Sequence, residues 1–210
     1  MSYGLEIYRS DGSLWVSPEV TPLNYMGKIR FGVGNSTVAT NVPITKSMTY
    51  FVRHDKEHGL GIFTMVKGST NYNIKITNAR YAGYIYVFAN HVLNEHGYGI
   101  AVYNQSGQMT WNSEMRPLQI IPVNNPYGVD QRGDITISVD FNAAISPGVV
   151  STWLAPLNPA AGIFLIGSLL AGAAGKKLCI SRFDGEQIQG QRPPYRYKPQ
   201  LLCINTDLYP

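Results

Sequence analysis

Residues 3–25 read YGLEIYRSDGSLWVSPEVTPLNY, and a related stretch, YGIAVYNQSGQMTWNSEMRPLQI, follows at residues 98–120. The two stretches align without a gap over 23 positions. Seven of these positions are identical: Tyr3/Tyr98, Gly4/Gly99, Tyr8/Tyr103, Gly12/Gly107, Glu19/Glu114, Pro22/Pro117 and Leu23/Leu118. A repeat of this length indicates two related units in tandem. We therefore expect an N-terminal module over residues 1–95 and a C-terminal module over residues 96–210.

Each copy of the repeat has the pattern of a β-hairpin. Apolar residues alternate with polar ones on both sides of a glycine turn, which is Ser10-Asp11-Gly12 in the first copy and Gln105-Ser106-Gly107 in the second. Alternation around such a turn is the sequence signature of two antiparallel strands. The repeat thus predicts the same hairpin twice.

Further strand patterns follow both hairpins at short, regular intervals. They are rich in β-branched and aromatic residues and cover residues 28–33, 48–53, 61–66, 72–77, 84–89, 118–123, 134–140, 149–154, 177–182 and 201–206. Many short strands separated by Gly, Asn, Asp or Pro are typical of antiparallel sandwiches and barrels. The sequence predicts an all-β protein with two tandem β-sandwich-like modules.

One segment departs from this pattern. Residues 160–175, AAGIFLIGSLLAGAAG, contain no charge, and the first module has no equivalent. A membrane helix needs about 20 apolar residues, so the segment is short for one, and its glycines disfavour a helix in water. Three interpretations remain: a helix or strand pair in the core, a loop buried against a neighbouring subunit, or a lipid contact. We interpret it as an apolar Gly/Ala-rich insertion in the second module. The expected partner-binding residues are Ile163, Phe164, Leu165, Ile166, Leu169 and Leu170.

The composition favours assembly with other proteins. Charged residues make up 14% of the 210 residues, against roughly 25% in an ordinary soluble domain. A surface so poor in charge is expected to be covered in part by partners. The net charge of +4 comes from scattered basic residues, and the densest basic cluster, residues 192–198, is interrupted by prolines. Nucleic-acid binding is therefore not expected.

The cysteines and the first residues bear on the folding compartment. Cys179 and Cys203 are the only cysteines and both lie in strand patterns. They would either pair across neighbouring strands or, as we favour, remain two buried free thiols. The first residues lack the basic and apolar regions of a secretion signal. We expect the chain to fold in a cytoplasm.

No pattern of catalytic residues emerges. His54 and His58 stand four residues apart with carboxylates between them, a spacing that suits metal ligands on a helix. They lie between two strand patterns, however, where a polar loop is expected. Nucleotide-binding and serine-hydrolase motifs are absent from the sequence, and no pair of carboxylates is placed for glycoside hydrolysis. We predict no enzyme, no metal and no cofactor.

The opening residues Tyr3-Gly4-Leu5-Glu6-Ile7-Tyr8, followed by Ser10-Asp11-Gly12, resemble the start of small proteins encoded among the tail genes of tailed bacteriophages and prophages. The resemblance covers about 25 residues, and the repeat supplies a second instance. It implies a virion structural protein at the tail tip or baseplate, folded in the cytoplasm of the bacterial host. Such a protein would dock on other tail proteins, within a symmetric assembly.

An alternative from another class is a carbohydrate or receptor-binding module in which exposed Tyr and Trp side chains stack on sugar rings. Trp15 and Trp111 occupy adjacent, not identical, positions of the two copies. Because side chains alternate along a strand, the two indoles are expected on opposite faces. This mismatch speaks against a duplicated sugar platform.

Overall fold

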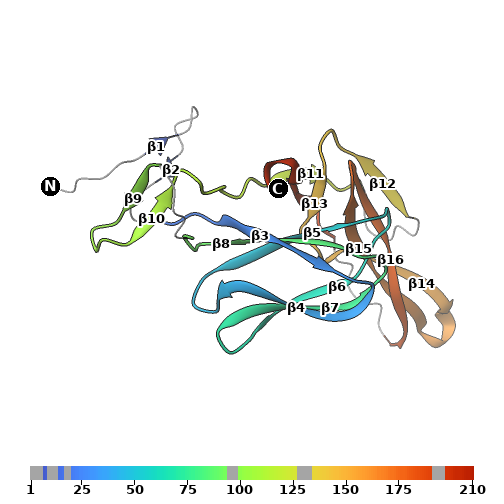
Figure 1. The fold of residues 1–210 in the computed structure, drawn as a ribbon. Coiled ribbons are helices and arrows are strands. Elements are labelled where there is room, and N and C mark those ends of the chain that lie inside the picture. The colour runs from blue at the N-terminus through green and yellow to red at the C-terminus, as the bar shows by residue number, and fades with distance from the viewer. Residues whose placement is uncertain (1–6, 9–13, 17–19, 94–98, 127–133, 191–196) are drawn as a thin grey trace.

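The computed structural model describes residues 7–8, 14–16, 20–93, 99–126, 134–190 and 197–210. These residues form an all-β protein, which confirms the predicted fold class (Figure 1). In this part of the chain the only helical elements are two short 3₁₀ helices, η1 (Pro159–Ala161) and η2 (Thr206–Leu208).

The central element is a six-stranded antiparallel sheet that draws on both halves of the chain. Its strands follow the order β11 (Ile121–Asn124), β17 (Gln200–Asn205), β13 (Ala143–Ile145), β5 (Met48–His54), β8 (Gly83–Ala89) and β3 (Asn24–Phe31). The two halves meet where Val52 of β5 pairs with Ile145 of β13. The six-stranded sheet therefore includes strands from both sides of the boundary expected after residue 95.

Two smaller sheets pack against one face of the six-stranded sheet. The first half of the chain supplies three strands in the order β4 (Gly34–Pro43), β7 (Asn71–Ala79) and β6 (Ile62–Lys67). The second half supplies four strands in the order β12 (Ile135–Ser138), β16 (Lys177–Gln189), β15 (Ile163–Ala174) and β14 (Val149–Asn158).

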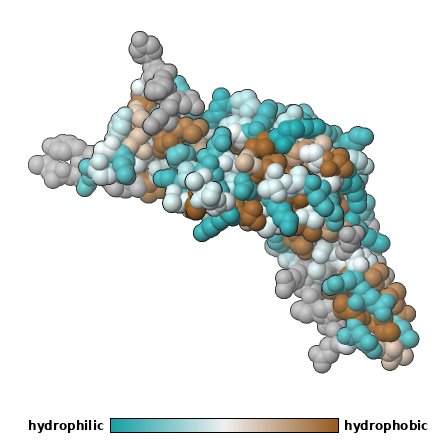
Figure 2. Space-filling model, turned by 60° about the horizontal axis from the view of Figure 1, so that its bottom comes forward, coloured by the Kyte–Doolittle hydropathy of each residue, from teal (hydrophilic) through white to brown (hydrophobic). Residues whose placement is uncertain are grey.

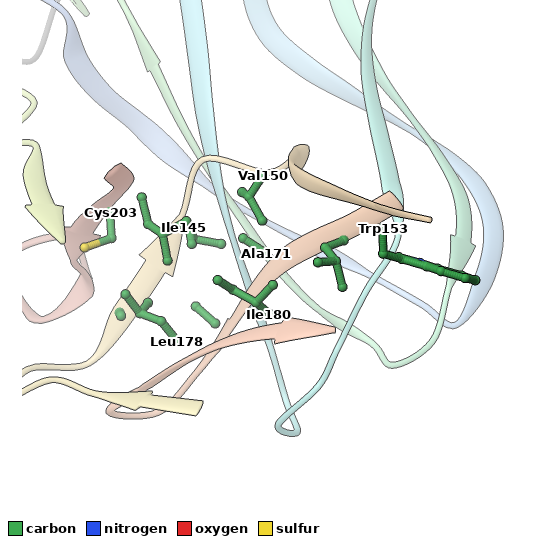
Figure 3. Packing of buried hydrophobic residues seen from close by; sticks show 11 residues of the cluster. Ile145, Val150, Trp153, Ala171, Leu178, Ile180 and Cys203 are labelled. Carbon is green, nitrogen blue, oxygen red and sulfur yellow. The ribbon is translucent and has the colours of Figure 1, made fainter. Parts of the chain in front are cut away.

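Each small sheet encloses its own apolar core, because alternate residues of a strand point to the same face. In the first half, Ile85 and Val87 of β8 pack against Ile74 and Ile76 of β7. In the second half the core comprises Ala143, Ile145, Val150, Trp153, Leu169, Ala171, Ala173, Leu178, Ile180, Leu201 and Cys203 (Figure 3). The chain is thus a pair of sandwiches that share one sheet.

A third cluster covers the opposite face of the shared sheet. Phe51 and Phe88 point to this face and pack against Tyr209, near the end of the chain. The Tyr209 hydroxyl donates to the carbonyl of Pro117 at 2.9 Å and accepts from the Gln119 amide at 2.9 Å. The cluster takes residues from both halves and joins them through side chains.

Both repeated stretches form the predicted hairpins, and they do so with the same register. In the first, β1 (Ile7–Tyr8) pairs with β2 (Leu14–Val16) through Ile7↔Val16 and Tyr8↔Leu14. In the second, β9 (Ala101–Tyr103) pairs with β10 (Met109–Asn112) through Val102↔Trp111 and Tyr103↔Met109. Adding 95 to the residue numbers of each pair in the first hairpin gives a pair of the second hairpin (7 to 102, 16 to 111, 8 to 103, 14 to 109). Each hairpin also has one irregularity in its pairing, at which the register passes over one residue. This residue is 15 in the first hairpin and 110 in the second, which are again 95 positions apart.

The strands that follow the hairpins repeat the same order of neighbours. The first half has β3-β8-β5 in the shared sheet and β4-β7-β6 in the small sheet. The second half has β11-β17-β13 and β12-β16-β15 in the corresponding places, with β14 added at the edge. We infer that the two halves derive from one duplicated unit of a hairpin and six strands.

The backbone contacts between the halves place counterparts opposite each other. Asn24 bridges Pro117, and the Leu118 amide donates to the Leu23 carbonyl at 2.8 Å. Leu23 therefore lies against Leu118, its own counterpart in the repeat. Strands β5 and β13 are antiparallel and pair Val52 with Ile145. Residue 51 therefore lies opposite residue 146, which is its counterpart at the same offset of 95 positions. Such reciprocal contacts are those of a two-fold interface.

Residues 163–174 of the apolar segment form strand β15, which pairs with β14 on one side and β16 on the other. The half of the segment that enters the core is buried, as the first of the three interpretations expected, but it is part of one strand and not a helix or a strand pair. The other half extends past the sandwich. We call this extension the arm and define it as residues 154–166 together with residues 186–189.

Candidate functional site

The hairpin β9–β10 exposes apolar side chains. Ile100 is 64% exposed and Tyr103 is 51% exposed. Val102 and Trp111 point away from the side of Tyr103 and pack with Met115. Within the described residues, β9 and β10 pair only with each other. An isolated two-stranded hairpin is marginally stable in water, so contact with another protein surface would stabilise this hairpin.

A shallow hollow runs along the same hairpin. Ile100, Tyr103 and Met109 supply apolar lining, and Asn112 and Glu114 supply polar groups at its edge. Glu114 is one of the residues that the repeat preserves, as the counterpart of Glu19. The hollow combines apolar anchors with polar groups, which is the make-up of a protein-binding patch.

The arm carries four of the six residues predicted to bind a partner. Ile163, Phe164, Leu165 and Ile166 are half-buried, while Leu157 beside them is 54% exposed. Leu165 packs against the core of the second half. Phe164 pairs with Pro156 and Ile188, so those three side chains share the opposite face. Figure 2 shows apolar residues interspersed with polar ones on the arm, which projects from the body of the molecule.

The other two predicted partner-binding residues lie in the interior of the fold. Leu169 is fully buried in the core of the second half, and Leu170 is 3% exposed. Neither side chain can reach a partner while the chain is folded. The prediction took the apolar run as one surface, whereas β15 enters the sandwich after Gly167, so that only the part before it lies on the arm.

A tryptophan fixes the base of the arm. The Trp153 ring lies over Gly167 and Gly185 on the two neighbouring strands, where a Cβ atom would collide with the indole or crowd it. The guanidinium of Arg182 stacks over the same ring at 5.0 Å. Glycine is required at these positions because the aromatic ring occupies the space of a side chain. The arm is therefore built on a packed base.

His54 and His58 do not combine into the metal pair that their spacing allowed. His54 is buried, with its ring edge-on to Phe31 and Phe63. Its Nδ1 lies 3.2 Å from the Tyr81 carbonyl oxygen, to which it donates. Burial is the main cause that lowers the pKa of His54 below 6.5, because the charged ring would lose its hydration. His54 is a neutral core residue.

This environment predicts a pH dependence of stability. The unfolded chain binds a proton at His54 at a higher pH than the folded chain does. The stability from neutral His54 is therefore fully present above about pH 6.5 and is lost as the pH falls through the folded pKa. We expect the free energy of unfolding to fall by up to about 1.4 kcal/mol per pH unit in that window.

Urea unfolding at about pH 7.5 and about pH 5.5 measures this effect. His54→Gln keeps a donor for the Tyr81 carbonyl and does not titrate. The loss of stability between the two pH values should therefore be smaller in this variant than in the parent, by the contribution of His54. Burial and Lys46 lower the pKa of His91 as well, so His91 contributes to the slope in both proteins and cancels from the comparison. Equal slopes in the two proteins would contradict the assignment.

A different set of potential ligands does come together. Glu57, His58 and Cys179 place one donor atom each within 4.8 Å of one another. The sequence did not predict this group, because Cys179 lies more than a hundred residues from the other two. A long-range contact between the loop after β5 and strand β16 creates it.

The two cysteines are free and buried, as the favoured interpretation of two thiols requires. Cys203 lies in the apolar core, where its thiol donates to the Ile121 carbonyl at 3.1 Å. Burial raises the pKa of Cys203 to about 11. Cys179 belongs to the polar group just described, so the two thiols have different surroundings.

In the part of the chain that the structure describes, no helix has the length and apolar character needed to cross a membrane. In comparisons with protein-family models, with curated proteins and with solved structures, nothing significantly matched the chain.

Proposed function

We propose that this protein is a structural component of a bacteriophage tail tip or baseplate, and that it docks on other tail proteins rather than catalysing a reaction. The docking surfaces are the hairpin β9–β10 and the outer part of the arm. The resemblance of the repeated stretch to tail-gene products supplies the identity of the assembly. The hairpin carries the proposal, because the repeat builds it twice with one register.

The exposure of the hairpin supports a docking role. A ribbon with open edges can add a strand from a partner, since its unpaired N–H and C=O groups seek hydrogen bonds. Ile100 and Tyr103 offer apolar anchors on the same ribbon. The arm offers a second apolar surface around Phe164 and Leu157.

The carbohydrate-binding alternative receives less support. Sugar platforms need exposed indole faces, whereas Trp111 is 9% exposed and Trp153 is 7% exposed. The side chain of Trp15 lies outside the described residues. The two described tryptophans therefore favour docking on proteins over stacking on sugars.

A single charged substitution at each surface tests the docking role. We expect Ile100→Asp and Phe164→Asp each to reduce incorporation into phage particles by at least about tenfold, because a buried unpaired carboxylate disrupts an apolar interface. The measurement is the amount of the variant in purified particles of a phage that lacks its own copy of the gene. Leu165 is unsuitable for this test, since it packs against the core.

Val33→Asp provides the matched control, because Val33 is 68% exposed and lies in the turn between β3 and β4, which belongs to neither the hairpin nor the arm. It should be incorporated like the unchanged protein. All three purified variants should unfold within about 0.5 kcal/mol of the parent. Normal incorporation of both Ile100→Asp and Phe164→Asp would refute the proposed docking surfaces.

A further inference from the structure

The loop after β5, residues 55–61, lies on the outer face of the sheet of the second half. Leu178 and Ile180 of β16 point into the core, so Cys179 between them points to the outer face. Cys179 is nevertheless fully buried. Gly172 of β15 pairs with Cys179, and the carbonyl oxygen of Gly59 occupies the place where a Cβ atom of Gly172 would be. The loop that contains Gly59 therefore covers Cys179.

Polar groups surround the Cys179 thiol beneath this loop. Glu57 and His58 reach it from the loop, and the donor atoms of the three residues lie within 4.8 Å of one another. The Thr136 hydroxyl lies 3.9 Å from the Cys179 sulfur on the neighbouring strand. A cysteine that serves only to fill an apolar core has no need of such neighbours, as Cys203 in its apolar surroundings illustrates.

The imidazole of His58 is held in place for a further ligand. Its Nδ1 lies 2.8 Å from the Ser181 hydroxyl oxygen. In the tautomer with a proton on Nδ1, the ring donates to Ser181 and leaves the Nε2 lone pair free. Metal-binding histidines use their second nitrogen in this way. The backbone of His58 has a φ of 55°, an uncommon value for a residue other than glycine, which often accompanies a functional constraint.

We propose that Glu57, His58 and Cys179 form a zinc site. Thiolate sulfur, imidazole nitrogen and carboxylate oxygen are ligands that Zn²⁺ takes at about 2.0–2.3 Å, so donor atoms around one ion lie roughly 3–4 Å apart. The group therefore needs only a small closure to bind the ion. The exposed Glu57 and half-buried His58 leave one side open to solvent, where a water completes the coordination.

The burial of Cys179 distinguishes this site from a cysteine–histidine catalytic pair. A nucleophilic thiol must contact its substrate, and Cys179 has no exposed surface. A metal ion would reach the thiol from the solvent side, past the exposed Glu57 and the half-buried His58. Because Glu57 and His58 belong to the first half of the chain and Cys179 to the second, the ion would tie the two halves together.

One neighbouring cation competes with the metal. The Lys177 ammonium lies 2.7 Å from a Glu57 carboxylate oxygen, with both side chains partly exposed. Binding of Zn²⁺ requires Glu57 to leave this exposed ion pair, which contributes little stability. Removal of the Lys177 charge should therefore strengthen the binding of Zn²⁺.

Titration of the chelator-treated full chain with Zn²⁺ and with Co²⁺ tests the site. We expect one ion per chain and, with Co²⁺, a near-ultraviolet thiolate-to-metal charge-transfer band. Cys179→Ser should abolish the band, and His58→Asn, which tolerates the positive φ, should weaken Zn²⁺ binding by at least about tenfold. Lys177→Gln should tighten it severalfold.

The second cysteine of the chain supplies the control. Cys203→Ser should keep both the stoichiometry and the charge-transfer band. The site is refuted if the parent chain binds no Zn²⁺ at micromolar concentration, or if the band survives Cys179→Ser, or if His58→Asn binds as tightly as the parent. None of these outcomes depends on assembly into a phage particle, so the zinc site and the proposed function fail independently.

Discussion

Replacement of Tyr209 by alanine is expected to lower the free energy of unfolding by about 3–5 kcal/mol, the cost of removing a large buried aromatic ring. The Tyr209 ring is 2% exposed and packs edge-on to Phe88, with ring centroids 4.9 Å apart. It also contacts Tyr25 at 5.4 Å. Urea unfolding of the parent and the variant, followed by tryptophan fluorescence, measures the loss.

Two companion variants separate the contributions of Tyr209. Tyr209→Phe keeps the ring and removes the hydroxyl that joins Pro117 and Gln119, which should cost about 1–3 kcal/mol because these backbone groups lose their partner. Leu208→Ala, at a neighbouring exposed position, should change stability by less than about 0.5 kcal/mol. A near-neutral Tyr209→Ala would show that the end of the chain does not hold the far face of the shared sheet.

The second large effect is expected at Gly172. A methyl group there would overlap the backbone carbonyl of Gly59, which cannot swing away as a flexible side chain could. We expect Gly172→Ala to cost about 3 kcal/mol, at the upper end of overpacking effects, because the loop over β15 and β16 must lift. The midpoint of urea unfolding reports this change.

Gly32→Ala is the matched control for this substitution. A Cβ atom at Gly32 meets nothing within 4 Å. Alanine should therefore leave stability unchanged or raise it slightly, through the smaller conformational freedom of the unfolded chain. Equal effects of the two substitutions would mean that the loop and β15 are not in close contact.

The sequence predicted the local structure well because the strands carry their own signal. All ten predicted strands outside the repeat overlap an observed strand, and both hairpins form. The strands that it missed have weak patterns. Strand β4 is largely polar, β13 is only three residues long, and β15 is rich in glycine and alanine, which have low strand propensity.

The arrangement of the strands could not be predicted in the same way. The pairing of β5 with β13, through Val52 and Ile145, joins strands from different halves, and no local pattern specifies such a contact. The same reason hides the group around Cys179, which a loop from the first half completes. The apolar run around β15 shows a related limit, since hydrophobicity alone does not tell Leu169, in the core, from Phe164, on the arm.

The meeting of Leu23 with its counterpart Leu118 has a consequence for the history of the chain. A single-copy ancestor would have bound a second molecule through this same contact, and its association would have depended on concentration. Joining two copies in one polypeptide makes the encounter intramolecular and independent of dilution. The two halves of one polypeptide can also differ from each other, and in the described residues the second half has strand β14 at the edge of its small sheet, where the first half has no counterpart.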